Sequence, residues 1–198
     1  ATTGATTGAT TSGLDTLSTN NANNTNQLSG VIFGGDSWLA GDDFTKIGTS
    51  EFGQNVTNTA IGGQKTSDVL NQLNQFEGNG GTFAPGSTVV LSIGANDLAN
   101  GVDRNTVTKN LNEIVSRLGT SGVKVILSGA PNATSYDNAI ASTNLQMDSL
   151  YNDVAKNNSN VTLVDVMSGF LNQKDLMDAS GFHLKDEASK TAYIDKIE

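Results

Sequence analysis

Short apolar runs alternate along this chain with segments whose apolar residues recur at helical spacing, and this alternation restricts the fold more than any other feature. The apolar runs predict five strands, at 30–34, 54–61, 87–93, 123–127 and 161–166. Buried strands separated by helices are typical of a parallel sheet that is covered on both faces. We therefore predict an α/β fold, a three-layer α/β/α sandwich with a five-stranded parallel sheet.

The predicted helices fill the intervals between the strands. One begins at an N-cap at Thr66 or Ser67 and continues through Phe76, and another runs from Asp103 or Asn105 to Leu118. The other expected helices are short ones within 38–52 and 167–177, and longer ones at 140–157 and 184–197. Segments 78–86, 94–101 and 178–183 are expected to be loops.

The N-terminal segment 1–28 differs in composition from the rest of the chain. It is rich in Thr, Gly, Ala and Asn, and it opens with the repeat Ala-Thr-Thr-Gly. So few large apolar side chains cannot offset the entropy lost on ordering. We expect a linker or stalk over 1–28, with a helix over 14–28 as an alternative, and one folded domain over 29–198. The first residue is not Met, so we expect a piece of a longer or processed polypeptide.

Composition excludes several functional classes. The net charge is −9 and the isoelectric point is near 4.4, which disfavours nucleic acid or an anionic membrane as partner. No apolar run approaches the roughly 18 residues of a spanning helix. The chain has no Cys and one His, which excludes disulfides, thiolate catalysis and a His-rich metal site. We expect no metal or organic cofactor, a monomer, and an extracellular or secreted location.

Three residues that can support catalysis directly follow predicted strands. Ser37 follows the first strand, Gly63 the second and Asn96 the third. The carboxyl ends of parallel strands meet at one edge of the sheet, so these residues should lie close together. A serine alone is a weak nucleophile, and Gly-Asp-Ser is also an ordinary turn sequence, so the function depends on what surrounds Ser37.

The order of these motifs resembles that of the SGNH hydrolases, the GDSL esterases and lipases. The matching pieces are Gly35-Asp36-Ser37, Gly62-Gly63, Gly94-Ala95-Asn96-Asp97 and His183, with Trp38 where the family has Leu. The resemblance implies a flavodoxin-like sheet and Ser37 as the nucleophile. It also implies an oxyanion hole formed by the N–H groups of Ser37 and Gly63 and the Asn96 amide, with Gly62 as the alternative glycine.

His183 is the one imidazole that could act as base toward Ser37. The family usually places Asp three residues before this His, and here that position is Ser180. Asp178, five residues before His183, is the acid that we expect to orient the ring. If Asp178 does not reach, a backbone carbonyl or Ser180 would orient His183 and leave a Ser–His dyad.

Two rival motifs fail at single positions. A Gly-x-Ser-x-Gly nucleophile elbow would need Gly at position 39, which is Leu. A phosphate-binding loop would need Gly directly before Lys65, and position 64 is Gln.

The sequence therefore predicts a serine ester hydrolase that cleaves short-chain acyl esters, with acetylated carbohydrate or another small ester as substrate. The alternative is a non-catalytic carbohydrate-binding or adhesion module that retains the hydrolase fold, and the missing Asp at position 180 is its main support. A purely structural spacer is a third reading. It does not account for Ser37, Gly63, Asn96 and His183 together.

Overall fold

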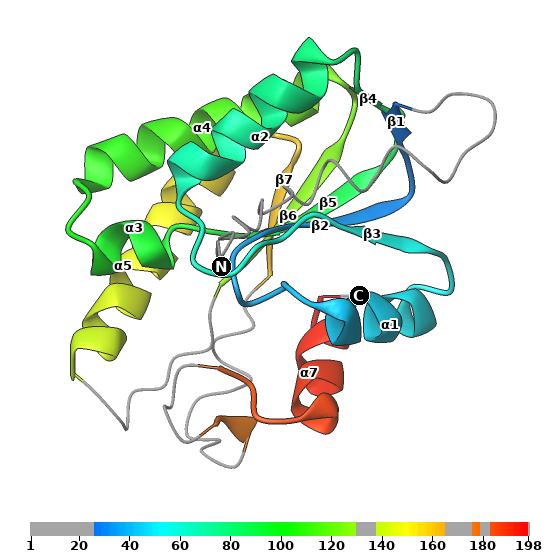
Figure 1. Cartoon of the computed structure of the whole chain (residues 1–198). Coiled ribbons are helices and arrows are strands. Elements are labelled where there is room, and N and C mark those ends of the chain that lie inside the picture. The colour runs from blue at the N-terminus through cyan, green and yellow to red at the C-terminus, as the bar shows by residue number, and fades with distance from the viewer. Residues whose placement is uncertain (1–25, 130–137, 165–175, 179–182, 198) are drawn as a thin grey trace, which may run out of the picture.

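A five-stranded parallel sheet forms the centre of the computed structural model, which describes residues 26–129, 138–164, 176–178 and 183–197 (Figure 1). The strand order is β3-β2-β5-β6-β7, and every neighbouring pair is parallel. The strands are β2 (Val31–Gly35), β3 (Val56–Asn58), β5 (Thr88–Ser92), β6 (Lys124–Ser128) and β7 (Val161–Val164). The predicted fold class is confirmed, and the observed strands lie at the predicted places within a few residues, with positions 165 and 166 outside the described residues.

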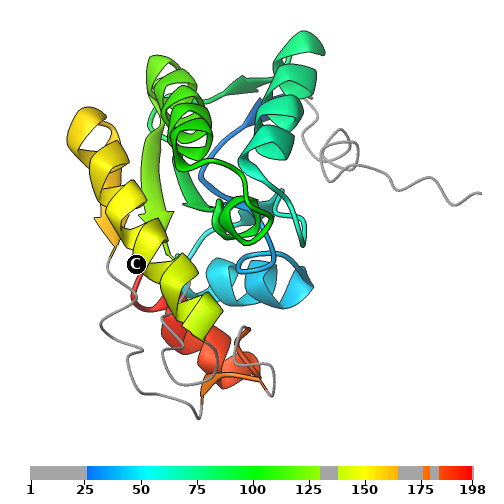
Figure 2. The same ribbon diagram turned by 90° about the vertical axis from the view of Figure 1, so that its left-hand side faces the viewer.

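Helices cover both faces of the sheet (Figure 2). One face packs against α2 (Thr66–Gly78), α4 (Arg104–Thr120) and α5 (Asn138–Asn157), and the other against α1 (Asp42–Glu51) and α7 (Glu187–Ile194). Along β2 the side chains alternate, because Ile32 belongs to the first core cluster and Val31 and Phe33 to the second. The sheet is thus buried on both faces, as the apolar strand sequences predicted.

Helix α4 confirms the prediction made from apolar spacing. Five of its side chains are 0–3% exposed, and the Asp103 carboxylate caps its N-terminus by accepting from the Thr106 N–H at 2.9 Å. The five buried residues are Val107, Leu111, Ile114, Val115 and Leu118.

The start of α2 differs from the prediction, because Lys65 and not Thr66 or Ser67 is its N-cap residue. The Thr66 N–H and hydroxyl both donate to the buried carboxylate of Asp97, at 2.8 and 2.7 Å. The helix start is therefore held by a distant contact with residue 97 and by a local one, since the Lys65 N–H donates to Asp68 Oδ2 at 2.8 Å.

Two segments predicted as loops contain regular structure. Helix α3 (Ala95–Ala99) lies within 94–101, and strand β4 (Thr82–Phe83) lies within 78–86. Strand β4 pairs in parallel with β1 (Gln27–Leu28), so the alternative prediction of a helix over 14–28 is wrong at its C-terminal end. Leu28 is buried in the core. The rest of segment 1–28, up to residue 25, lies outside the described residues.

The C-terminal helix is shorter than predicted. It begins at Glu187 and not at residue 184, because the Asp186 carboxylate caps it by accepting from the Ser189 N–H. Leu184 instead forms an isolated antiparallel bridge with Met177. The predicted helix at 167–177 lies largely outside the described residues. None of the described helices combines the length and the apolarity that crossing a membrane requires.

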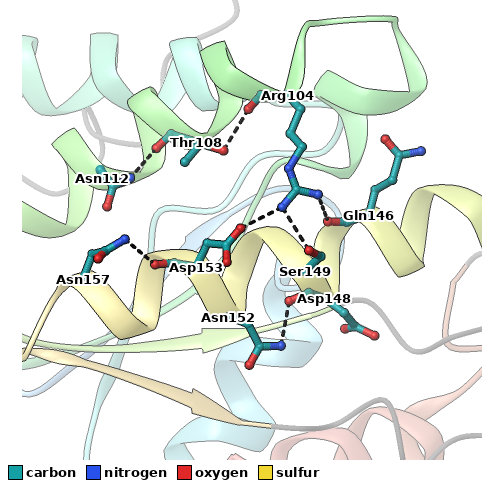
Figure 3. A network of polar contacts seen from close by, with 9 residues as sticks. All are labelled: Arg104, Thr108, Asn112, Gln146, Asp148, Ser149, Asn152, Asp153 and Asn157. Atoms are coloured by element: carbon teal, nitrogen blue, oxygen red, sulfur yellow. Dashed lines mark hydrogen bonds and ion pairs between the residues drawn. The ribbon is translucent and has the colours of Figure 1, made fainter.

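A polar network joins α4 to α5 at the surface (Figure 3). The Arg104 guanidinium donates to Asp153 Oδ2 at 2.9 Å, to Ser149 Oγ at 3.0 Å and to the Gln146 carbonyl at 3.5 Å. The side chains of Arg104 and Asp153 are 36% and 52% exposed, so water screens the ion pair and its net contribution is small.

We expect burial rather than this network to hold α4 in place. Arg104→Ala should lower the free energy of unfolding by less than about 1 kcal/mol. Leu111→Ala, at a side chain that is 0% exposed, should lower it by about 2–5 kcal/mol through lost burial and a new cavity. Urea unfolding of both variants beside the parent protein measures the two losses, and equal losses would contradict this ranking.

Candidate active site

The carboxyl ends of β2, β3 and β5 bring the three predicted strand-end segments to one edge of the sheet. Gly35 at the end of β2 is in register with Ser92 at the end of β5, and the loop after β3 continues along β2. In that loop the Ile61 N–H donates to the Gly35 carbonyl at 3.0 Å, which carries Gly62 and Gly63 to the turn that holds Ser37.

Gly35 allows β2 to turn against β5. Its φ is +117°, and a Cβ built there would lie 1.9 Å from the Ser92 carbonyl oxygen. The Asp36 N–H then donates to that same oxygen at 2.9 Å. The Asp36 carbonyl accepts from the Leu39 and Ala40 N–H groups, at 3.2 and 3.1 Å. The result is a tight turn with the half-buried Ser37 at its tip.

Ser37 and His183 are brought together from opposite ends of the domain. His183 Nε2 lies 2.9 Å from Ser37 Oγ, although 146 positions separate the two residues in the sequence. The indole of Trp38, which is 2% exposed, lies beside the imidazole with ring centroids 6.0 Å apart. Trp38 also contacts Tyr193 of α7, with ring centroids 6.1 Å apart, so a packed aromatic pair backs the His183 ring.

Asp178 lies on the other side of the imidazole, but not in hydrogen-bonding contact with it. Its Oδ2 is 3.9 Å from His183 Nδ1, a distance compatible with an ion pair when the ring is protonated. The bridge between Met177 and Leu184 causes this proximity, because the Asp178 N–H donates to the His183 carbonyl at 2.7 Å. Ser180, the other residue considered for orienting the ring, lies outside the described residues.

The Gly62-Gly63 turn lies next to Ser37. A Cβ on Gly62 would be 3.8 Å from the Ser37 Cβ, and Gly63 has a φ of +79° with open space where its Cβ would be. Among the described residues, no backbone carbonyl accepts from the N–H groups of Ser37, Gly62 or Gly63. These donors are therefore available to a bound oxyanion, and both glycines remain candidates.

Asn96 lies at the start of α3, after Gly94 in the left-handed region with φ +116°. Its side-chain amide nitrogen donates to the Gln64 carbonyl at 3.0 Å and to Asp36 Oδ2 at 3.3 Å. The amide group therefore lies between the Gly62-Gly63 loop and the nucleophile turn. An amide NH₂ group has two hydrogens and both are engaged here, so Asn96 must exchange one of these contacts before it can donate to an oxyanion.

Asp36 is a buried carboxyl group beneath this site, 1% exposed. Burial raises its pKa from 3.8 to about 7, and the nearby Asp97 carboxylate adds to the rise, although the Trp38 N–H that donates to Asp36 Oδ1 at 3.1 Å opposes it. The carboxyl group of Asp36 thus titrates near neutral pH.

Three residues for which the sequence pattern indicated no role lie at the site in the structure. Asp36 and the Gln64 carbonyl both accept from the Asn96 amide, and Trp38 contacts the His183 ring. Asp36 stands between a buried strand and the candidate nucleophile in the sequence, and the turn at Gly35 is what directs it inward. No local pattern indicates the Gln64 carbonyl. In the described part of the chain, no group of three or more His, Asp or Glu side chains is arranged to hold a metal ion.

A family model for GDSL-like lipases and acylhydrolases matches residues 34–190 of the sequence. This range runs from the end of β2 into α7 and includes every candidate site residue. Comparison of the sequence with curated proteins gives no match.

Solved structures share this fold at low sequence identity. A protein from Slackia heliotrinireducens described as an SGNH hydrolase superposes with a TM-score of 0.67 at 15% identity, covering 84% of this chain and 95% of that one. TesA superposes with a TM-score of 0.66 at 21% identity, covering 85% and 96%. The acetylxylan esterase Axe2 from Geobacillus stearothermophilus, solved as a catalytic mutant, gives 0.66 at 15% identity, covering 85% and 93%.

We expect Gly35→Ala to prevent the β2 turn from forming. An added Cβ would overlap the Ser92 carbonyl oxygen, so the variant should lose at least about 4 kcal/mol of stability or fail to fold. Gly41→Ala is the matched control, since its φ is +111° with no atom within 4 Å of the added Cβ, and it should cost about 1–2 kcal/mol. Soluble yield and thermal unfolding compare the two, and equal stabilities would contradict the clash.

The buried Asp36 should make stability fall as pH rises. Its folded pKa of about 7 lies above the unfolded value near 3.8, so the folded protein retains a proton that the unfolded chain has released between these values. Stability from this group is present below about pH 4 and is lost as the pH rises toward 7, by on the order of 4 kcal/mol.

Urea unfolding at pH 5 and pH 8 tests this linkage. The loss of stability between the two values should be much smaller in Asp36→Asn than in the parent protein. Asp103→Asn is the control, since hydrogen bonds from the Thr106 and Asn105 N–H groups hold the pKa of Asp103 below its usual value, outside this window. An unchanged loss in Asp36→Asn would show that Asp36 does not titrate as inferred.

Proposed function

Because this chain belongs to the GDSL-like lipase/acylhydrolase family, we propose that it is a serine ester hydrolase that works through an acyl-enzyme. The observation that carries the proposal is the 2.9 Å contact between Ser37 Oγ and His183 Nε2, at the sheet edge where the Gly62-Gly63 turn and Asn96 also lie. A nucleophile in contact with a base, facing available N–H donors, is the arrangement that acyl transfer requires.

In the first half-reaction, Ser37 Oγ attacks the ester carbonyl carbon while His183 Nε2 takes the hydroxyl proton. The carbonyl π bond opens and its oxygen becomes the oxyanion, to which the Ser37 and Gly63 N–H groups donate. The Asn96 amide joins them by exchanging its contact with the Gln64 carbonyl for the oxyanion, while it keeps its contact with Asp36. The imidazolium then returns its proton to the leaving alkoxide as the C–O bond breaks. In the second half-reaction, water replaces Ser37 as nucleophile and the free acid leaves.

Asp178 contributes electrostatically rather than through a hydrogen bond in this arrangement. It lies 3.9 Å from His183 Nδ1, and the two side chains are 36% and 42% exposed. Charges at this distance in contact with water interact by roughly 1 kcal/mol. Asp178 should therefore stabilise the positive charge that develops on the imidazole during the reaction and favour the tautomer with the proton on Nδ1, with a smaller effect on rate than either Ser37 or His183.

We propose short acyl esters, with acetylated carbohydrate first among them, as the substrate class. The absence of long apolar insertions in the sequence argues against a lid for long lipid chains. The likeness to an acetylxylan esterase supports the same choice at the level of fold. Small soluble acetyl esters and acetylated oligosaccharides are the substrates to test first.

Hydrolysis of p-nitrophenyl esters from acetyl to dodecanoyl tests the proposal. Ser37→Ala and His183→Ala should lower kcat by roughly 10⁴-fold or more, to near background. Asp178→Ala should lower kcat only about tenfold, because its charge acts across 3.9 Å in partly exposed surroundings. A steady fall of kcat/KM with chain length would support the short-acyl preference.

Two outcomes would count against this reading. Turnover by the parent protein that matches Ser37→Ala on every ester, including acetylated xylan oligosaccharides, would exclude the hydrolase. Binding of those oligosaccharides without turnover would instead favour the carbohydrate-binding module.

A loss in Asp178→Ala as large as that in His183→Ala would show that the carboxylate closes onto the imidazole during the reaction.

A further inference from the structure

The Asp36 carboxyl group and the Asn96 amide together connect the three segments that supply the candidate oxyanion donors. Asp36 Oδ1 accepts from the Trp38 N–H at 3.1 Å, across the turn that presents Ser37. Asp36 Oδ2 accepts from the Asn96 amide at 3.3 Å, and the same amide nitrogen donates to the Gln64 carbonyl at 3.0 Å. Asp36 therefore joins the nucleophile turn to the start of α3, and the Asn96 amide continues the connection to the glycine loop.

We propose that Asp36 is a positioning residue for the oxyanion site, holding the Asn96 amide at a set place relative to the Ser37 turn. The inference rests on the proposed ester hydrolysis, because an oxyanion forms only in that reaction. Asp36 acts through Asn96 and touches neither the nucleophile oxygen nor the imidazole in any described contact. The effect of Asp36 on the rate should therefore depend on the presence of Asn96.

The neighbouring Asp97 is a buried carboxylate whose contacts serve the fold rather than the site. It is equally buried, at 1% exposed, but it accepts from the N–H and the hydroxyl of Thr66, at the start of α2. Asp36 instead directs both oxygens to groups of the site. Two buried acids at one sheet edge thus have separate tasks: one anchors a helix and one orients an amide.

The charge of Asp36 is compatible with a place beside an oxyanion. A permanent carboxylate there would oppose the negative charge that develops on the substrate oxygen. Burial, with Asp97 nearby, raises the pKa of Asp36 to about 7, so a large share of the molecules carries the proton at neutral pH. The neutral acid still offers oxygen atoms to the Trp38 N–H and to Asn96.

A double-mutant cycle on kcat tests the coupling. Asn96→Ala removes an oxyanion donor and should lower kcat by roughly 10²–10³-fold. Asp36→Asn keeps the shape but turns an amide NH₂ group toward one of the two donors, and it should lower kcat by about tenfold or more with KM within about threefold. If Asp36 acts through Asn96, the double variant should be no slower than Asn96→Ala, within about threefold.

Thr59→Val is the matched control for loss of a buried hydrogen bond near the same sheet edge. Thr59 is 9% exposed, and its hydroxyl donates to the Phe33 carbonyl at 2.9 Å. This variant should be less stable but should keep kcat within about twofold, both alone and combined with Asn96→Ala. Thermal unfolding of every variant separates loss of rate from loss of fold.

A second measurement keeps the test independent of turnover. The Asn96 side-chain amide signals in ¹⁵N–¹H spectra, assigned by their loss in Asn96→Ala, should shift in Asp36→Asn and stay in place in Thr59→Val. Losses of kcat that multiply in the double variant, or amide signals unmoved by Asp36→Asn, would overturn the positioning role. If the parent protein lacks esterase turnover, the proposed function fails, and the amide signals alone decide whether Asp36 holds Asn96.

Discussion

The close approach of β2 to β5 at Gly35 is the constraint on which the site depends. Only a hydrogen atom fits between the Gly35 Cα and the Ser92 carbonyl, and the backbone leaves the strand there with a positive φ. The departure is sharp enough that the next residue, Asp36, turns inward and is buried while Ser37 stays half-buried at the tip. The position of the candidate nucleophile is thus a consequence of sheet geometry.

Burial of polar groups beneath this edge is the second organising feature. Asp36 and Asp97 are each 1% exposed, and each accepts two hydrogen bonds: Asp36 from the Trp38 N–H and the Asn96 amide, and Asp97 from the N–H and the hydroxyl of Thr66. An unpaired buried carboxylate would be strongly destabilising, so these hydrogen bonds are required once the sheet is formed. They also connect the loops after β2, β3 and β5 to one another beneath the site.

Elements whose signal is periodic were predictable from sequence, and elements set by distant contacts were not. The buried stripe of α4 and the alternation along β2 follow from apolar spacing that any helix or strand in that position would need. By contrast, the buried contact of Thr66 at the start of α2 depends on Asp97, 31 positions away, and the two-residue strand β4 depends on β1 beside it. Pairs so short carry no periodicity to detect.

The sequence by itself determined the α/β class, the five parallel strands and the sheet edge on which Ser37, Gly63 and Asn96 lie, because strand order along the chain and strand direction dictate where loops emerge. Only the tertiary structure decided how the nucleophile turn meets the segment that carries His183. His183 reaches Ser37 because α7 packs against α1, and Asp178 approaches the imidazole because Met177 pairs with Leu184. Spacing along the chain does not encode such contacts, since they arise from packing between residues far apart in sequence.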